Sequence, residues 1–158
     1  ARPAVLQLFG FAQAVENHLD RSVRDSGLAI VWLIADETSG AIDALDQPVA
    51  TALFRIVQEA INNAIRHAHA GKISVRLRAT ARTVGIDVQD DGIGITAAAR
   101  RNGSGIDNMR TRARLISARF EIARNKEGSG TTIHVTLPHQ AQNPDKGEQA
   151  DKGQGTDR

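Results

Sequence analysis

Cysteine is absent from the 158-residue sequence. Its absence excludes a disulfide framework, a cysteine-ligated zinc or iron–sulfur site and a thiol nucleophile. No apolar run approaches the roughly 18–20 residues that a helix needs to cross a bilayer. The first residues also lack the charged-then-apolar pattern of a secretory signal. The sequence therefore predicts a soluble, cytoplasmic protein without direct membrane contact.

An excess of one charge is also missing, since 20 Lys and Arg residues stand against 18 Asp and Glu residues, a formal net charge of +2. This balance does not demand a nucleic-acid partner. Aromatic residues are only 3% of the chain, so the core must be built from valine, isoleucine, leucine and alanine. With 41% apolar and 24% charged residues, the composition is typical of one soluble globular domain.

Hydrophobic spacing divides the chain into helices and strands. Helical spacing predicts three helices, at about residues 4–25, 48–69 and 106–117. Residues 28–34 are interpreted as a short buried strand, and alternation or apolar pairs predict four more, at 73–77, 84–88, 120–122 and 133–137.

The order of these elements predicts an α+β fold. Strands that follow one another directly favour antiparallel hairpins, and three helices can cover one face of the sheet. We therefore expect a two-layer α/β sandwich, with a mixed, mostly antiparallel sheet and three helices on one face. The domain is predicted to span residues 1–138, beginning with a lead-in helix. Residues 139–158 contain no valine, isoleucine, leucine, methionine or aromatic residue and are predicted to form a flexible polar tail.

One face of the predicted helix 48–69 carries polar residues at spacings of three and four: Arg55, Glu59, Asn63, Arg66 and His67. Such a face usually only meets solvent. Here Asn62 and Asn63 lie in mid-helix, where asparagine is a poor helix former, so helix stability does not account for them. A glutamate carboxylate and an asparagine carbonyl one turn apart also form an oxygen pair suited to a hard cation or a water.

Two polar residues share the inward register of predicted strands. Asp90 follows strand 84–88, and its carboxylate is costly to bury unless it meets a donor. It either caps the turn before Gly92 or accepts a hydrogen bond from the amino group of a ligand such as adenine. Thr131 precedes strand 133–137, and its hydroxyl is expected to bond either a backbone carbonyl or a ligand.

Paired glycines bracket the segment between these two residues: Gly92 and Gly94, then Gly103 and Gly105. Glycines let backbone N–H groups approach a ligand closely, and the second pair leads into a helix whose N-terminus favours phosphate. The first pair also fits a loose dinucleotide fingerprint, but Asp90 and Asp91 directly before it would repel a pyrophosphate. No G-x-x-x-x-G-K-[ST] segment occurs, which excludes a P-loop ATPase.

Four segments, in this order, resemble the boxes of the GHKL ATPases: Glu59-Ala-Ile-Asn-Asn63-Ala-Ile-Arg66-His67, Asp90-Asp-Gly92-Ile-Gly94, Gly103-Ser-Gly105 and Gly130-Thr131. The short interval between the two glycine boxes and the segment Phe54-Arg-Ile-Val-Gln-Glu59 are typical of one branch. That branch comprises the sensor histidine kinases of the nitrate-sensor type, the partners of NarL. The resemblance covers about residues 2–138 and implies the Bergerat (GHKL) fold.

The resemblance also implies ATP and Mg²⁺ as cofactors and assigns roles to the site residues. Asn63 would coordinate Mg²⁺, and Glu59 would act as general base or water-orienting group in γ-phosphoryl transfer. Arg66 and His67 would neutralise phosphate charge. Asp90 would bind adenine, while Thr131 and the glycines Gly92, Gly94, Gly103 and Gly105 would shape the pocket. Phosphoryl transfer needs mainly positioning and charge neutralisation, which this set can supply.

A phosphoacceptor segment of the E-L-H-D type does not occur, and His18, His69, His134 and His139 are interpreted as surface histidines. The resemblance therefore implies the ATP-binding half of a bacterial two-component kinase, which supplies the γ-phosphate to a histidine on an absent dimerisation domain. Its expected partners are those dimerising helices and a response regulator of the NarL type, and the isolated domain is expected to be a monomer. The alternatives are a GHKL ATPase and a non-catalytic nucleotide-sensing or anti-sigma-type module of the same fold.

Overall fold

The computed structural model describes residues 10–24, 26–36, 40–66, 69–94 and 104–138, and all structural statements refer to these ranges. The described helices are α2 (Phe11–Val23), α3 (Gln47–Arg66) and α5 (Ser104–Leu115). The strands are β1 (Ala29–Asp36), β2 (Lys72–Ala79), β3 (Thr83–Asp90), β4 (Arg119–Arg124) and β5 (Thr131–Pro138).

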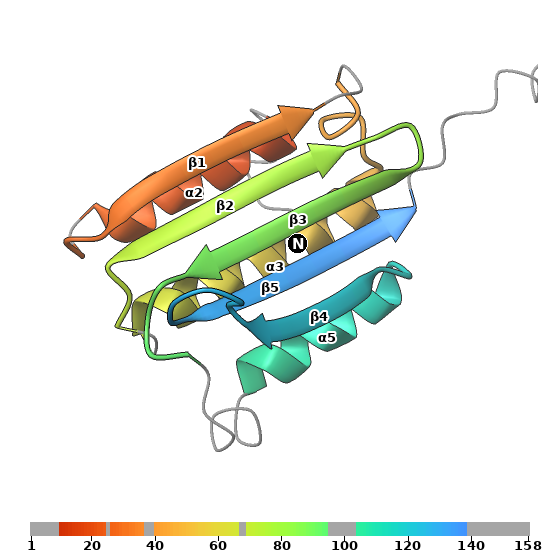
Figure 1. Ribbon diagram of the computed structural model, residues 1–158. Helices are drawn as coiled ribbons and strands as arrows, with labels where there is room; N and C mark the ends of the chain where they lie inside the picture. The colour runs from red at the N-terminus through yellow and green to blue at the C-terminus, as the bar shows by residue number, and fades with distance from the viewer. Residues whose placement is uncertain (1–9, 25, 37–39, 67–68, 95–103, 139–158) are drawn as a thin grey trace, which may run out of the picture.

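These elements form two layers, with the five-stranded sheet in front and the three described helices behind it in Figure 1. The strand order is β1-β2-β3-β5-β4. β1 pairs with β2 in parallel and the other neighbours pair antiparallel. The parallel pair follows from the chain path, because α3 makes the crossover between β1 and β2, as parallel strands require. The predicted α+β sandwich with helices on one face is confirmed.

The register of the sheet follows the predicted alternation. Odd-numbered residues of β2 and β5 and even-numbered residues of β3 are buried against the helices. Antiparallel pairing places them directly opposite one another, as in Val75 against Val88 and Val88 against Ile133. From the helix layer, Leu53, Ile56 and Ile61 of α3 are fully buried. The core thus consists mainly of aliphatic side chains, as the composition predicts.

Strand β1 differs from the prediction of a buried strand. It lies at one edge of the sheet, where Leu33 is 51% exposed and Ile34 is 48% exposed. Trp32 is partly buried against the core. An edge strand has a neighbour on one side only, so even its inward side chains are incompletely covered. The apolar run correctly predicted a strand, but the prediction of its burial was wrong.

Helix α3 begins as predicted, with Pro48 in its first turn, where its missing N–H costs no helix hydrogen bond. The helix ends at Arg66, earlier than the predicted end near residue 69. His69 has a φ of +48°, which is outside the helical range, so this residue is not part of the helix.

His18 is also placed differently from the prediction of a surface histidine. It is half-buried in α2, and its ring meets the ring of Phe54 edge-on at 6.0 Å between centroids. Burial, together with the nearby charge of Arg21, lowers the pKa of His18 below its ordinary value, although a hydrogen bond with Asn62 opposes this. That hydrogen bond gives Asn62 a structural role in holding α2 against α3.

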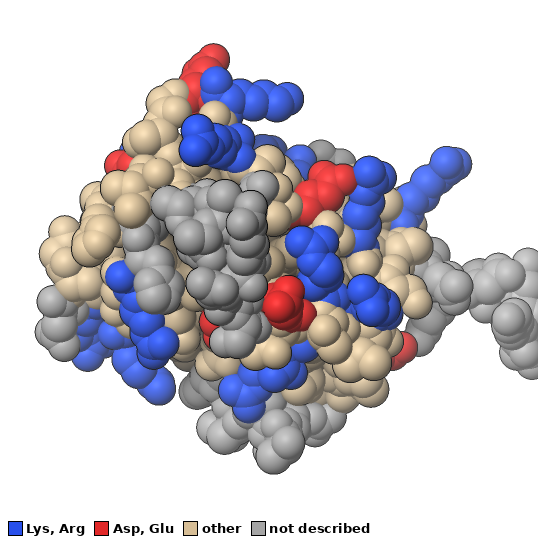
Figure 2. Space-filling view, turned by 90° about the horizontal axis from the view of Figure 1, so that it is seen from below, with Lys and Arg blue, Asp and Glu red and all other residues tan. Residues whose placement is uncertain are grey.

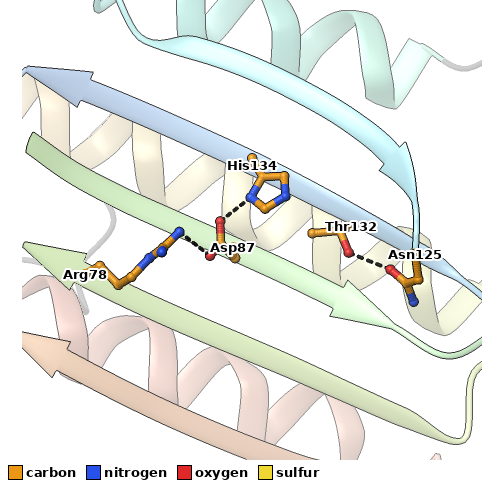
Figure 3. A network of polar contacts seen from close by, with 5 residues as sticks. All are labelled: Arg78, Asp87, Asn125, Thr132 and His134. Atoms are coloured by element: carbon orange, nitrogen blue, oxygen red, sulfur yellow. Dashed lines mark hydrogen bonds and ion pairs between the residues drawn. The ribbon is translucent and has the colours of Figure 1, made fainter. Parts of the chain in front are cut away.

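The face of the sheet turned away from the helices carries a small polar network (Figure 3). The Asp87 carboxylate accepts a hydrogen bond from Arg78 at 2.6 Å and pairs with His134 Nδ1 through its other oxygen. His134 therefore lies on the outward register, as predicted. The Arg78 and His134 side chains of this network are 46% and 41% exposed, whereas the Asp87 carboxylate that they share is 16% exposed. Because the network lies on the face away from the helices, it is a convenient control for substitutions elsewhere.

Candidate functional site

Asp90 ends β3 and caps the turn that follows it. Its Oδ1 accepts a hydrogen bond from the backbone N–H of Gly92 at 2.9 Å, and the backbone N–H of Thr131 also donates to the carboxylate. The turn-capping alternative is therefore correct. It does not exclude a ligand, because the two oxygens of a carboxylate can accept about four hydrogen bonds.

The environment of Asp90 is unfavourable for its negative charge. Burial raises the pKa of the carboxyl above its ordinary value of 3.8, and the neighbouring charge of Asp91 adds to this. The backbone donors at Gly92 and Thr131 oppose the shift but do not cancel it. A half-buried carboxylate that the fold does not stabilise fully is a common feature of binding sites.

Thr131 lies next to this carboxylate, at the start of β5. It is 3% exposed, and no other polar side chain among the described residues is buried as deeply. Its Oγ1 lies 3.8 Å from the position that a Cβ on Gly94 would occupy. Gly94 has a φ of +80°, a conformation that favours glycine. The sheet end thus groups Asp90 and Thr131 with the first glycine pair, of which Gly92 is buried.

A second group of candidate site residues lies where α3 packs against the N-terminus of α5. Glu59 and Asn63 are half-buried on α3 and face Gly105 in the first turn of α5. A Cβ at Gly105 would overlap Glu59 Oε1 and lie 3.4 Å from Asn63 Nδ2. A side chain at position 105 would therefore push the Glu59 carboxylate out of the space that it occupies. This packing places both side chains at a helix N-terminus, where free N–H groups attract negative charge.

A polar hollow of about 580 Å³ continues from Glu59 along the groove between α3 and α5. Its lining residues are Thr51, Arg55, Gln58, Glu59, Asn62, Asn108, Met109 and Arg112. Figure 2 shows Lys and Arg side chains spread over the side of the molecule that carries α5 and β4. Cationic side chains around a polar hollow favour an anionic ligand. Arg112 was not predicted as a site residue, because its place beside α3 depends on long-range packing.

Both groups lie at the same end of the molecule. Figure 1 shows the C-terminal ends of α3 and β3 and the N-terminal ends of α5 and β5 together at the left of the view. Asn63 and Asp90 are therefore not on opposite sides of the fold. Arg66, the last residue of α3, is exposed at this end. His67 and Gly103, as well as residues 95–103 between the two groups, lie outside the described residues.

A cluster of three or more His, Cys, Asp or Glu side chains that could hold a metal is not present among the described residues. A magnesium ion bound mainly through phosphates and waters needs only one or two protein oxygens, so a single asparagine amide suffices. None of the described helices combines the length and apolar character that a membrane crossing requires.

Comparison with known families decides the classification. A family model described as "Histidine kinase-, DNA gyrase B-, and HSP90-like ATPase" matches residues 49–141, more than half of the chain. The chain belongs to this ATPase family. The match includes the four predicted boxes and helix α3 from its third residue onward, including Glu59 and Asn63.

Curated relatives of this ATPase domain are named as sensor kinases. The chain is 35% identical over 144 residues to an "Uncharacterized sensor-like histidine kinase" of Chloroflexus aurantiacus, covering 87% of this chain and 24% of the relative. It is 32% identical over 138 residues to the sensor histidine kinase LiaS of Bacillus subtilis, covering 87% of this chain and 36% of LiaS. The chain thus spans about a quarter to a third of these relatives. Neither name identifies the nitrate-sensor branch, which stays a prediction.

Solved structures agree with the fold. The histidine kinase domain of the blue-light activated kinase EL346 of Erythrobacter litoralis superimposes with a TM-score of 0.64. The alignment covers 88% of this chain and 65% of that chain, with 21% sequence identity. At this identity the likeness supports the Bergerat-type architecture alone.

Proposed function

We propose that this domain binds Mg·ATP and supplies the γ-phosphate for phosphorylation of a histidine on the dimerisation domain of a sensor kinase. The observation that carries the proposal is the placement of Glu59 and Asn63 against the N-terminus of α5, at the same end of the fold as Asp90. This arrangement offers an acceptor for adenine and, at the other group, donors and oxygens for a triphosphate.

Each residue then has a distinct task. Asp90 accepts a hydrogen bond from the exocyclic amino group of adenine. Thr131, Gly92 and Gly94 form the wall of the adenine pocket beside it. The N-terminus of α5, with Arg66, His67 and the glycines Gly103 and Gly105, binds phosphate oxygens. Asn63 supplies an amide oxygen that would hold Mg²⁺, which neutralises phosphate charge when bound.

Glu59 acts on the incoming histidine. The lone pair of one imidazole nitrogen forms the bond to the γ-phosphorus, while the bond from phosphorus to the β,γ-bridging oxygen breaks and ADP leaves. The Glu59 carboxylate accepts a hydrogen bond from the N–H of the other ring nitrogen, which aims the lone pair at phosphorus. As the new bond leaves positive charge on the ring, the proton of this N–H passes to the carboxylate. Its position against Gly105 keeps the carboxylate close to the phosphate-binding helix end.

The direct test uses the domain with Mg²⁺ and γ-labelled ATP, together with a supplied dimerisation and phosphoacceptor domain from a sensor kinase. We expect label on the histidine of that domain. Label released only to water would indicate a GHKL ATPase, and label on serine of a protein substrate would indicate an anti-sigma-type kinase. Binding without any transfer would indicate a nucleotide-sensing module, and each of these three outcomes contradicts the proposal.

We also propose that the full-length protein is a kinase of the NarL-partner branch, with its catalytic domain in the cytoplasm. The segment Phe54-Arg-Ile-Val-Gln-Glu59 and the short interval between the glycine boxes support this assignment. Phosphate should then pass from the phosphorylated histidine to receiver domains of NarL type in preference to other receivers. Sedimentation of the isolated domain should give a monomer.

Replacing Gly105 by alanine should lower phosphoryl transfer about tenfold, because the added Cβ displaces the Glu59 carboxylate and misplaced catalytic groups lose rate steeply. Stability should change little, since the overlapping atom is the end of a flexible side chain and alanine is a good helix former. Transfer rates and thermal melts measure the two effects. Gly85→Ala is the matched control, because a Cβ there meets nothing closer than 4.0 Å. Full transfer by Gly105→Ala would contradict the placement of Glu59.

A further inference from the structure

Side-chain hydrogen bonds connect the turn between β4 and β5 to the end of β3. Asn125 Nδ2 donates to the backbone carbonyl of Asp90 at 2.7 Å and to that of Ser129 at 2.8 Å. Ser129 Oγ donates to the backbone carbonyl of Asp91 at 2.9 Å. The turn therefore holds the backbone of both residues at the point where β3 ends.

Asn125 is itself held on its other side. Its Oδ1 accepts a hydrogen bond from Thr132 Oγ1 at 2.5 Å, as Figure 3 shows, and its backbone N–H donates to the carbonyl of Gly130 at 3.1 Å. Both amide donors and the amide oxygen of the side chain are thus in use. Aspartate has the same shape but no donor, so it cannot replace these bonds.

Gly130 shows how closely the turn approaches β3. Its φ is +105°, and a Cβ at this position would overlap the carbonyl oxygen of Asp90 and lie 2.9 Å from Asn125 Nδ2. The next residue, Thr131, directs its backbone N–H to the Asp90 carboxylate. The segment from Asn125 to Thr131 therefore fixes Asp90 through both its backbone carbonyl and its side chain.

We propose that Asn125 is a positioning residue that sets the base selectivity of the nucleotide site by fixing the orientation of Asp90. The inference rests on the proposed function, in which Asp90 accepts the amino group of adenine. Guanine presents a carbonyl oxygen at the corresponding position, so a fixed carboxylate rejects it, since two acceptors then face each other. A carboxylate with a loosened backbone can turn away and loses part of this discrimination.

The test compares Asn125→Asp with Asp87→Asn, a change in the outward network of the same strand. Dissociation constants for Mg·ATP and Mg·GTP are measured by calorimetry on protein whose folding has been verified by circular dichroism. The lost hydrogen bonds should reduce the ratio of GTP to ATP dissociation constants about tenfold in Asn125→Asp. Asp87→Asn should retain the wild-type ratio. Thr132→Val, which removes only the bond to Asn125 Oδ1, should reduce the ratio by a smaller factor and serves as the deciding variant if Asn125→Asp does not fold.

The variant Asp90→Asn distinguishes a failure of the Asn125 hypothesis from a failure of the proposed adenine-binding role of Asp90. Suppose that Asp90→Asn loses base selectivity but a folded Asn125→Asp keeps the wild-type ratio of dissociation constants. Asn125 then has no positioning role, and the proposed function stands. Thr132→Val takes the place of Asn125→Asp in this comparison if the latter does not fold. If Asp90→Asn itself keeps the wild-type ratio, the assignment of Asp90 to adenine fails. An equal loss of ATP and GTP affinity in the Asn125 variant indicates a merely structural role and also overturns the inference.

Discussion

Replacement of Glu59 by glutamine is expected to lower phosphoryl transfer to a supplied histidine domain by about 100- to 10,000-fold, the usual contribution of a general base. ATP binding should stay close to that of the wild type. Glutamine has the shape of glutamate and fits the same space against Gly105, so the fold and the phosphate-binding helix end are preserved. What is lost is the negative charge that accepts and holds the imidazole proton.

The measurement follows label from γ-labelled ATP to histidine under single-turnover conditions, which separates the chemical step from nucleotide binding. Glu121→Gln is the matched control, because Glu121 lies half-exposed on the outward face of β4 and pairs with Arg119 at 2.7 Å. It should transfer phosphate at the wild-type rate. Transfer at full rate by Glu59→Gln would show that Glu59 is not the base.

The sheet was predictable because the helices cover only one of its faces. In such a sheet, successive side chains of a strand point alternately to the core and to solvent. The alternation of Ile73, Val75 and Leu77 with polar residues therefore indicates both the strand and its register. Strand β1 lacks this signal, since its apolar residues follow one another without alternation. Its run of apolar residues does not tell whether a strand lies in the middle of a sheet or at its edge.

The candidate site was predictable only to the extent that its residues are close in sequence. The one-turn spacing of Glu59 and Asn63 places them on one helix face, and paired glycines mark a close approach. The pairing of Glu59 with Gly105 adds a contact between residues far apart in the sequence. The spacing alone does not show that Glu59 fills the space in front of this glycine.

Two asparagines show why the remaining contacts could not be predicted. The sequence indicates that helix stability does not account for Asn62, because asparagine is unfavourable in mid-helix, and the structure gives the reason: Asn62 bonds His18 of the preceding helix. The sequence pattern did not indicate a role for Asn125, because this residue lies in a polar turn, where asparagine is common. Its importance comes from contacts with Asp90 and Thr132, which are 35 and 7 residues away in sequence.

Replacement of Asp90 by asparagine is expected to weaken ATP binding about 10- to 100-fold, the loss of a hydrogen bond to a charged acceptor. The asparagine amide would present a donor where the adenine amino group also donates. GTP binding should change much less, so the preference for ATP falls. Calorimetric titration of both nucleotides measures this, and undiminished ATP binding would remove Asp90 from the adenine site.

The same substitution should stabilise the unliganded fold at neutral pH. Burial raises the pKa of Asp90 in the folded state above its ordinary value of 3.8, so the ionised carboxylate costs folding free energy. This cost is fully present above the folded-state pKa, decreases as the pH falls through it and vanishes below 3.8. Thermal melts should therefore show a higher Tm for Asp90→Asn than for the wild type at pH 7, and a difference that shrinks on acidification. A variant that is less stable at neutral pH would show that the backbone donors outweigh burial. If stability rises while ATP affinity falls, the carboxylate is kept for its ligand at the expense of the fold.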